Sequence, residues 1–379
     1  MHYQPRDRCP IMDFGFWDET RVIWREYGLP ADVNTDDFFG MDPLWIGISG
    51  NPFLCPAFES RVLEDHPDRQ VSIDGDGVTK ESGKFLGTIP HYLDHTLKDR
   101  ESWEKEVKWR LDPTNPDRIP KDLDETAARF KAPNRDYPIV IGAGSIFGRL
   151  RDLMGVEGIA MLVYDDRKLF EEMVERTTDC VIAAITPILE TGIQFEYASM
   201  WEDMCYRAGP LLTPRIFHQV LVPNYQRITS TLRRYGVDVV VLDCDGDISL
   251  LVPHWLEGGV NCMFPIEVGV WGADPVAYRK QYGKGLLMMG GVSKRLLAGT
   301  HEEITAEVER LAPLVDEGGF IPTPDHRVPP DVPLTSYIHY LQEARRVWGR
   351  NLPNLRPMGD LDLSAPRARD SEYRWDDVG

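Results

Sequence analysis

An alternation of short apolar runs with helix-length amphipathic segments, which begins after residue 137, constrains the fold of this chain more than any other feature. Apolar runs of this length are typical of buried strands. They occupy residues 139–141, 193–197, 237–242, 260–266, 285–289 and 319–322, and earlier candidates lie at 44–49 and 9–13. Strands that alternate with helices form parallel βαβ units. The sequence therefore predicts an α/β fold, and a closed (β/α)8 barrel of the TIM type, with a decorated N-terminal segment, fits better than an open Rossmann sheet.

Helix start and stop signals fill the segments between these runs. Thr300 and Glu303 have the spacing of a capping box, and Gly318 follows the last apolar position of that helix. Further helices are expected over residues 17–27, 103–111, 169–192 and 223–236. Residues 69–87 differ, because they alternate in polarity around the Asp-Gly-Asp-Gly sequence at 74–77, which predicts a β-hairpin.

Composition divides the 379-residue chain into three parts. Residues 1–135 are irregular and rich in Pro, Asp and aromatic side chains, so we expect them to contribute to the barrel and to cover it. Residues 136–350 contain the strand–helix alternation and are predicted to form the main barrel. Residues 351–379 are polar and are expected to lie over the surface as a tail.

The charge and the apolar profile argue against several classes of function. Lys and Arg number 42 against 61 Asp and Glu, and the formal net charge of −19 disfavours binding to nucleic acid or anionic lipid. No apolar stretch reaches the roughly 18 residues of a membrane span. The first residues lack the apolar core of a signal peptide, so we expect a cytoplasmic protein. The six cysteines show no CxxC spacing, which argues against a disulfide framework or a zinc finger.

Two aspartates follow the most apolar strand candidate. In a barrel, functional groups gather where the strands end. Asp243 and Asp245 come after four apolar residues, and residues two apart on a strand project from the same face. Two such carboxylates repel each other unless a cation or a shared proton lies between them. We therefore expect Asp243 and Asp245 to be functional, and Asp247, beyond Gly246, to be a solvated turn residue.

Other strand ends carry side chains that suit the same site. Glu267 follows the strand candidate at 260–266, and His326 lies between two prolines after the last candidate. Together with Asp243 and Asp245 they make an oxygen-rich set with one imidazole, which suits a divalent metal ion, with zinc the first expectation. These four residues are the predicted metal ligands. The predicted catalytic residues are Asp243, Asp245, His326 and Glu202, the last of which lies just past the strand candidate at 193–197.

Four residues are predicted to contact substrate. Phe147 belongs to a glycine-rich loop at 142–148 whose third glycine is one position late for a dinucleotide fingerprint, so we interpret the loop as shaping a substrate site. Trp17 and Trp201 lie in aromatic-rich segments that would line a pocket, although core packing explains them equally well. Lys294 would neutralise an anionic ligand or be an exposed lysine at a helix start, and both interpretations stay open. Apart from His326, the histidines are expected to be surface or core residues.

Several strand-end motifs together resemble the uroporphyrinogen decarboxylase superfamily, which includes the decarboxylase and the methyl-corrinoid methyltransferases of methanogens and acetogens. The resemblance covers residues 139–349. Its landmarks are Gly-Pro-Leu-Leu-Thr-Pro at 209–214, Asp-Cys-Asp-Gly at 243–246, Pro-Ile-Glu at 265–267, Gly-Gly-Val-Ser-Lys at 290–294 and Gly-Gly-Phe-Ile-Pro at 318–322, followed by Asp325 and His326. The resemblance implies a (β/α)8 barrel with its cleft at the carboxyl ends of the strands.

The chain departs from both branches of that superfamily. The decarboxylase opens with Arg-Gln-Ala-Gly-Arg, whereas residues 13–19 here are acidic and aromatic and would repel a polycarboxylate, so porphyrinogen decarboxylation is not expected. The methyltransferase branch usually holds zinc on a His-x-Cys pair and a distant Cys, and Asp243, Asp245 and His326 stand at these positions. Harder ligands put a thiol acceptor in doubt and better suit an oxygen donor such as a methyl ether.

The resemblance thus implies a corrinoid-dependent methyltransferase component. It would be an O-demethylase that moves a methyl group from a methoxylated or methylated small molecule to cob(I)alamin on a separate corrinoid-binding protein, because this chain has no Asp-x-His-x-x-Gly segment. Two alternatives stay open, namely a decarboxylase or lyase that acts on a small acid and a non-catalytic barrel that binds a ligand. A homodimer also stays open.

Overall fold

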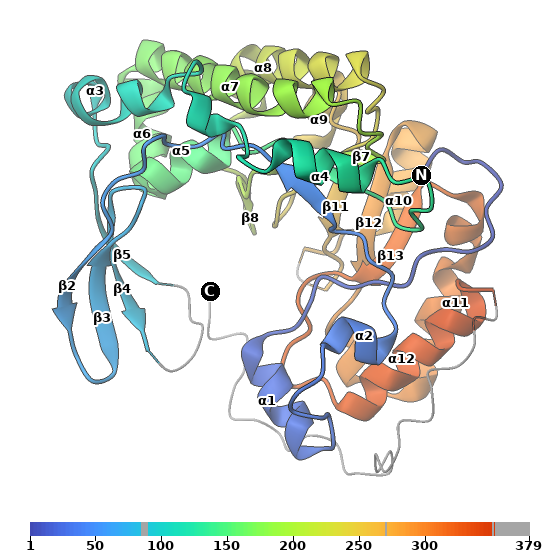
Figure 1. Ribbon diagram of the computed structural model, residues 1–379. Helices are drawn as coiled ribbons and strands as arrows, with labels where there is room; N and C mark the ends of the chain where they lie inside the picture. Colours follow the sequence, from blue (N-terminus) through green and yellow to red (C-terminus); the bar gives the residue numbers. More distant parts are fainter. Residues whose placement is uncertain (85–89, 270, 351, 353–379) are drawn as a thin grey trace. The chain divides into compact units, whose positions relative to one another are not determined.

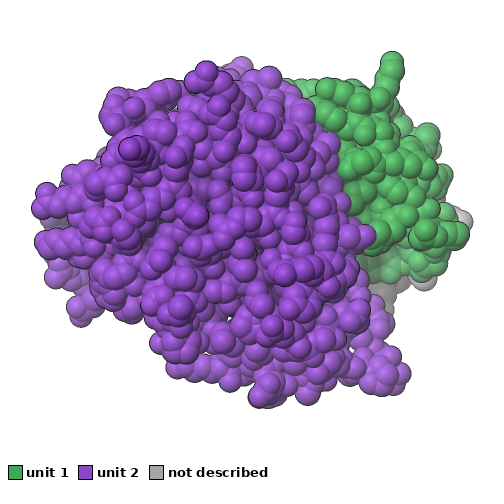
Figure 2. Space-filling view, turned by 90° about the horizontal axis from the view of Figure 1, so that it is seen from above, with its two compact units in different colours: residues 1–43, 264–379 green, residues 44–263 purple. Residues whose placement is uncertain are grey.

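The chain divides into two units, which Figure 2 colours separately. Unit 1 consists of residues 1–43 and 264–379, and unit 2 consists of residues 44–263. The computed structural model describes residues 1–84, 90–269, 271–350 and 352. The predicted tail at 351–379 lies outside the described residues except for Leu352, and the predicted division of the chain at residue 135 stays a prediction.

Parallel strands form the centre of unit 2. They are β1 (Gly47–Ser49), β6 (Val140–Gly142), β7 (Tyr197–Trp201) and β10 (Val240–Asp243), and each pairs in parallel with the next. A further strand, β11 (Cys262–Ile266), begins in unit 2 and ends in unit 1. The first three residues of β10 are fully buried, as expected for a parallel strand that is covered on both faces.

Helices separate these strands along the chain, so the predicted βαβ pattern is confirmed for unit 2. They are α5 (Phe147–Met154), α6 (Val156–Asp165), α7 (Arg167–Glu190), α8 (Pro214–Arg234) and α9 (Val252–Gly258). In Figure 1, α7 and α8 run side by side, in agreement with their many mutual contacts. The predicted helix start at Pro223 is wrong, because Thr213 caps α8 and Pro214 occupies its first turn, where a missing N–H costs nothing.

The N-terminal part of unit 2 contains a separate antiparallel sheet. Its strands are β2 (Arg61–Asp65), β3 (Arg69–Ile73), β4 (Val78–Gly83) and β5 (His91–His95). The hairpin predicted at 74–77 is confirmed, since the Asp74 carboxylate accepts the N–H groups of Asp76 and Val78 and Gly77 has a φ of 74°. Shorter elements complete the unit: α3 (Arg100–Ser102), η1 (Trp103–Val107), η2 (Lys108–Leu111), η3 (Pro116–Arg118), α4 (Leu123–Phe130), β8 (Cys205–Tyr206) and β9 (Gly209–Pro210).

Unit 1 joins the N-terminal segment to the last strands and helices. Two parallel strands, β12 (Leu287–Val292) and β13 (Phe320–Pro324), pair with each other. The helices are α1 (Asp18–Glu26), α2 (Thr35–Phe39), α10 (Pro275–Tyr282), η4 (Gly283–Gly285), η5 (Leu296–Ala298), α11 (His301–Glu317) and α12 (Leu334–Val347). The indole of Trp24 packs 5.0 Å from the ring of Tyr337 and donates to the carbonyl of Val332, which fixes α1 against the C-terminal region.

The observed helices and strands test several local predictions from the sequence. The capping box of Thr300 and Glu303 is confirmed, and α11 ends before Gly318 as expected. The helix expected at 103–111 forms as a π turn followed by a 3₁₀ turn. The strand predicted at 9–13 is wrong, because these residues take part in no strand pairing. The α/β class with parallel strands is confirmed, whereas closure into a (β/α)8 barrel stays a prediction. No helix among the described residues is long and apolar enough to cross a membrane.

Candidate functional site

Three aspartates gather at the carboxyl ends of β7 and β10 in unit 2. The two strands pair in register with Asp243 opposite Trp201, so the residues that follow them emerge side by side. One carboxylate oxygen from each of Asp203, Asp243 and Asp245 lies within 4.8 Å of the other two. We call these three residues the carboxylate trio. The structure thus brings Asp243 and Asp245 together, and it adds Asp203.

The backbone around Asp203 is held in an unusual conformation. Asp203 has a φ of 40°, in the left-handed region that non-glycine residues rarely adopt, and such strain often occurs at functional sites. Arg151 donates to its carbonyl oxygen, and its guanidinium lies 5.0 Å from the ring of Trp201. The backbone N–H of Asp245 donates to the Asp203 carboxylate at 3.3 Å. These contacts fix where the trio presents its oxygens.

The electrostatics of the trio favour a bound cation. Burial raises the pKa of Asp203, and the neighbouring charge of Asp245 raises it further, while Arg151 lowers it. Carboxylates this close repel each other, and a divalent ion between them would relieve the repulsion. Three carboxylate oxygens are hard ligands of the kind that Mg²⁺, Mn²⁺ and Ca²⁺ prefer and that Zn²⁺ also accepts. The trio therefore fits a divalent metal ion.

Glu202, the residue before Asp203, has a different environment. It is fully buried, and its carboxylate accepts the N–H groups of Ile146 at 2.9 Å and Gly148 at 2.7 Å, at the start of α5. Burial raises the pKa of Glu202, and these N–H groups oppose the rise. This geometry gives Glu202 the structural role of a helix cap. Its predicted catalytic role stays a prediction.

The predicted substrate residues of unit 2 differ in exposure. Phe147 is fully buried and packs against Phe170 with ring centroids 6.4 Å apart, which makes it a core residue of α5. Trp201 is partly exposed, and its ring faces Arg151. The glycine-rich segment is a loop between β6 and α5, as expected, and a side chain at Gly148 would clash with the carbonyl oxygen of Glu202, 2.4 Å from the added Cβ. Trp201 is thus the better placed of the two to meet a ligand.

The predicted residues of unit 1 lie around the end of β13. His326 packs edge-on against Phe14 at 5.3 Å and stacks with Trp17 at 6.1 Å. The guanidinium of Arg327 lies 5.4 Å from the ring of Trp17. Glu267 is buried and accepts a hydrogen bond from the indole of Trp271. Within unit 1, His326 is therefore set among aromatic rings.

Asp325, directly after β13, accepts three backbone N–H groups. It is fully buried, and one oxygen accepts the N–H groups of Val268 at 2.9 Å and Gly269 at 2.7 Å. The other oxygen accepts the backbone N–H of Lys294 at 2.8 Å. Asp325 thus ties together the loops that follow β11, β12 and β13. Lys294, predicted to contact an anionic ligand, contributes its backbone to this network, and its side chain is partly buried.

Sequence reasoning did not include Asp203 among the ligands. The signal was present, because Asp203 lies two residues beyond the end of β7 just as Asp245 lies two residues beyond the end of β10. The role of Asp325 as an anchor of the strand ends was also missed. An acidic residue that directly follows a buried strand is consistent with either role, and only its hydrogen-bond partners distinguish a ligand from an anchor.

Comparison with known proteins identifies the family of this chain. The family model of uroporphyrinogen decarboxylase (URO-D) matches residues 88–347. The chain belongs to the URO-D family. No curated protein sequence matches it. A solved structure, a methyltransferase from Methanosarcina mazei, aligns with a TM-score of 0.55 at 16% sequence identity, over 90% of this chain and 95% of that one. At this identity the likeness shows that the two proteins share a fold.

Proposed function

We propose that this URO-D family protein is a methyltransferase that removes a methyl group from an oxygen of a small molecule. The acceptor would be cob(I)alamin carried by a separate corrinoid protein. Membership of the family, the fold shared with a methyltransferase from Methanosarcina mazei and the carboxylate trio support this proposal. The trio is the observation that carries it, because hard oxygen ligands suit an oxygen-bound methyl donor better than a thiol acceptor.

Asp203, Asp243 and Asp245 would hold the divalent ion. When bound, the ion supplies Lewis-acid polarisation of the oxygen that carries the methyl group, which makes that oxygen a better leaving group. The N–H of Asp245 holds the Asp203 carboxylate in position, and Arg151 partly balances the negative charge. The roles of Glu267 and His326 as ligands stay predictions from the sequence.

Aromatic side chains would orient the donor. Trp201 lies at the end of β7, two residues before Asp203. The contact of Trp17 with substrate stays a prediction from the sequence. Flat indole surfaces bind aromatic rings by stacking and by apolar burial. We therefore expect methoxylated aromatic compounds to be better donors than methanol or small aliphatic ethers.

The proposal is tested by following the methylation of cob(I)alamin by absorbance with a panel of methoxylated aromatics. The wild type should consume cob(I)alamin, and Asp245→Asn should lose activity by about 100-fold or more, since one ligand and one charge are removed at the reacting centre. Asp247→Asn is the matched control, because Asp247 accepts the N–H of Ser249 at 3.0 Å and belongs to no three-residue ligand group in the described part of the chain. If Asp245→Asn retains full activity, or if no donor reacts with the wild type, the proposal is wrong.

A further inference from the structure

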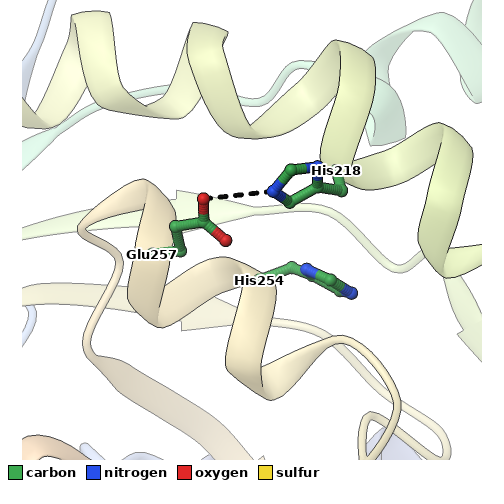
Figure 3. Close-up of side chains that lie close together, drawn as sticks. All are labelled: His218, His254 and Glu257. Carbon is green, nitrogen blue, oxygen red and sulfur yellow. Dashed lines mark hydrogen bonds and ion pairs between the residues drawn. The ribbon is translucent and has the colours of Figure 1, made fainter.

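A second group of potential ligands lies on the helices of unit 2, on elements other than the strand ends. His218 belongs to α8, and His254 and Glu257 belong to α9 (Figure 3). One ligand atom from each of the three residues lies within 4.8 Å of the other two. The Nε2 atom of His218 is 3.1 Å from a carboxylate oxygen of Glu257, and the two imidazole rings are 5.4 Å apart. We call these residues the helix trio.

The scaffold of the helix trio is rigid. The Oγ1 atom of Thr229 on α8 donates to the carbonyl of Gly258 at 2.8 Å, and the side chain of Gln226 donates to the carbonyl of Glu257 at 3.1 Å. His254 and Glu257 are three residues apart on α9, so they share one face of that helix. The spacing of the three ligands is therefore set by helix packing rather than by a loop.

The composition of the trio suits a transition metal. Two imidazoles and one carboxylate are ligands that Zn²⁺ and its neighbours in the first transition row bind well, and three protein ligands leave positions for water. The side chains of His218 and Glu257 are about half exposed, at 49% and 50%, so solvent can reach those positions.

A simple surface ion pair explains the trio less well. A pair of His218 and Glu257 in water would contribute little to stability, on the order of 0 to 1 kcal/mol. Such a pair does not by itself require a second imidazole, whereas the ring of His254 lies 5.4 Å from His218 and 6.0 Å from Phe217. Three potential ligands on two packed helices suit a metal site.

We propose that His218, His254 and Glu257 bind one divalent transition-metal ion, with Zn²⁺ as the expected ion and water completing its coordination. The ion would link α8 to α9 at the surface of unit 2. Because α9 follows the loop that carries Asp245, the link would restrain the helix next to that loop. The site is independent of the proposed methyl transfer, and its binding is measured without any methyl donor.

The test uses the full chain after removal of metal with a chelator. Calorimetric titration with Zn²⁺ should give a binding event that His218→Ala and Glu257→Gln weaken by at least about tenfold, since loss of even an outer-shell partner of a metal site costs about that much. His66→Ala is the matched control, because His66 also contacts a glutamate, Glu64, at 2.9 Å, but belongs to no three-residue ligand group among the described residues. It should bind Zn²⁺ like the wild type.

Copper distinguishes the helix trio from the carboxylate trio. With one equivalent of Cu²⁺ the electron paramagnetic resonance spectrum should show coupling to imidazole nitrogen, which carboxylates cannot produce, and this coupling should persist in Asp245→Asn. It should weaken in His218→Ala and His254→Ala. If these two variants keep the wild-type nitrogen coupling and the wild-type Zn²⁺ affinity, the helix trio is not a metal site, whatever the outcome of the methyl-transfer assay.

Discussion

Carboxylates follow the strands in both units, yet the two sets have opposite surroundings. In unit 2, one carboxylate oxygen from each of Asp203, Asp243 and Asp245 lies within 4.8 Å of the other two, and the N–H of Asp245 donates to Asp203. In unit 1, Asp325 accepts three backbone N–H groups and is fully buried. A cation would relieve the repulsion inside the first set, whereas hydrogen bonds already stabilise the charge of the second carboxylate. The first arrangement suits a ligand set, and the second suits an anchor.

The comparison has a direct consequence for mutation. Removing a ligand should change metal binding and activity with little loss of stability, because the folded protein is relieved of repulsion. Removing an anchor should cost stability, because buried N–H groups lose their acceptor. The predictions below use this contrast, from the largest expected effect on stability to the smallest.

Asp325→Ala should lower the free energy of unfolding by about 4 kcal/mol, because three buried N–H donors are left without an acceptor. Denaturant unfolding followed by circular dichroism measures the change. Asp325→Asn should fall between the wild type and Asp325→Ala, since one oxygen acceptor remains. If Asp325→Ala lowered the free energy of unfolding by less than about 1 kcal/mol, Asp325 would behave like a residue of the carboxylate trio, and the distinction between anchor and ligand would be wrong.

Asp13 is a second buried carboxylate of unit 1, with fewer donors than Asp325. The N–H of Gly15 donates to it at 2.8 Å and Tyr337 donates its hydroxyl, but burial raises the pKa of Asp13 from 3.8 to about 6. A raised folded-state pKa contributes stability that is fully present below pH 3.8 and is lost as the pH rises through about 6. This loss amounts to about 3 kcal/mol at most.

Unfolding free energies at several pH values between 4 and 7 test this expectation. The wild type should lose stability relative to Asp13→Asn as the pH rises, because the amide has no proton to release. Parallel pH profiles for the two proteins would mean that Asp13 is stabilised as a carboxylate, like Asp325.

Asp245→Asn should change the free energy of unfolding of the metal-free protein by less than about 1 kcal/mol, and any change should be an increase, because one of three mutually repelling charges is removed. The backbone N–H that holds Asp203 is unaffected. Thermal melts in the presence of chelator measure this effect. A loss as large as that of Asp325→Ala would identify Asp245 as an anchor.

Asp247→Asn should be nearly silent in both stability and activity. Its carboxylate accepts the N–H of Ser249 at 3.0 Å, and the amide oxygen of Asn can accept the same bond. Thermal melts and the cob(I)alamin assay give both values. If Asp247→Asn were inactive, Asp247 would belong to the functional site, and the assignment of the site to the carboxylate trio would be wrong.

The sequence predicts the parallel strands from periodicity, and it places Asp243 and Asp245 together at one strand end, although Asp245 lies beyond β10. It does not predict whether an acidic residue at a strand end acts as ligand or anchor. Glu202 and Asp203 are adjacent, yet one caps α5 and the other joins the trio, since the left-handed backbone at Asp203 turns its side chain. The helix trio was missed for a similar reason, because His218 is distant in sequence from α9 and only helix packing brings it to His254.

The central claim is that the carboxylate trio binds a divalent ion. It is tested most directly by the metal content of protein purified without chelator, in a His218→Ala background that removes the contribution of the helix trio. The account predicts about one divalent ion per chain, which is lost in Asp243→Asn and Asp245→Asn and retained in Asp247→Asn. Metal-free protein that gains no thermal stability from added Zn²⁺, Mn²⁺ or Mg²⁺, or a metal content unchanged by Asp245→Asn, would contradict it.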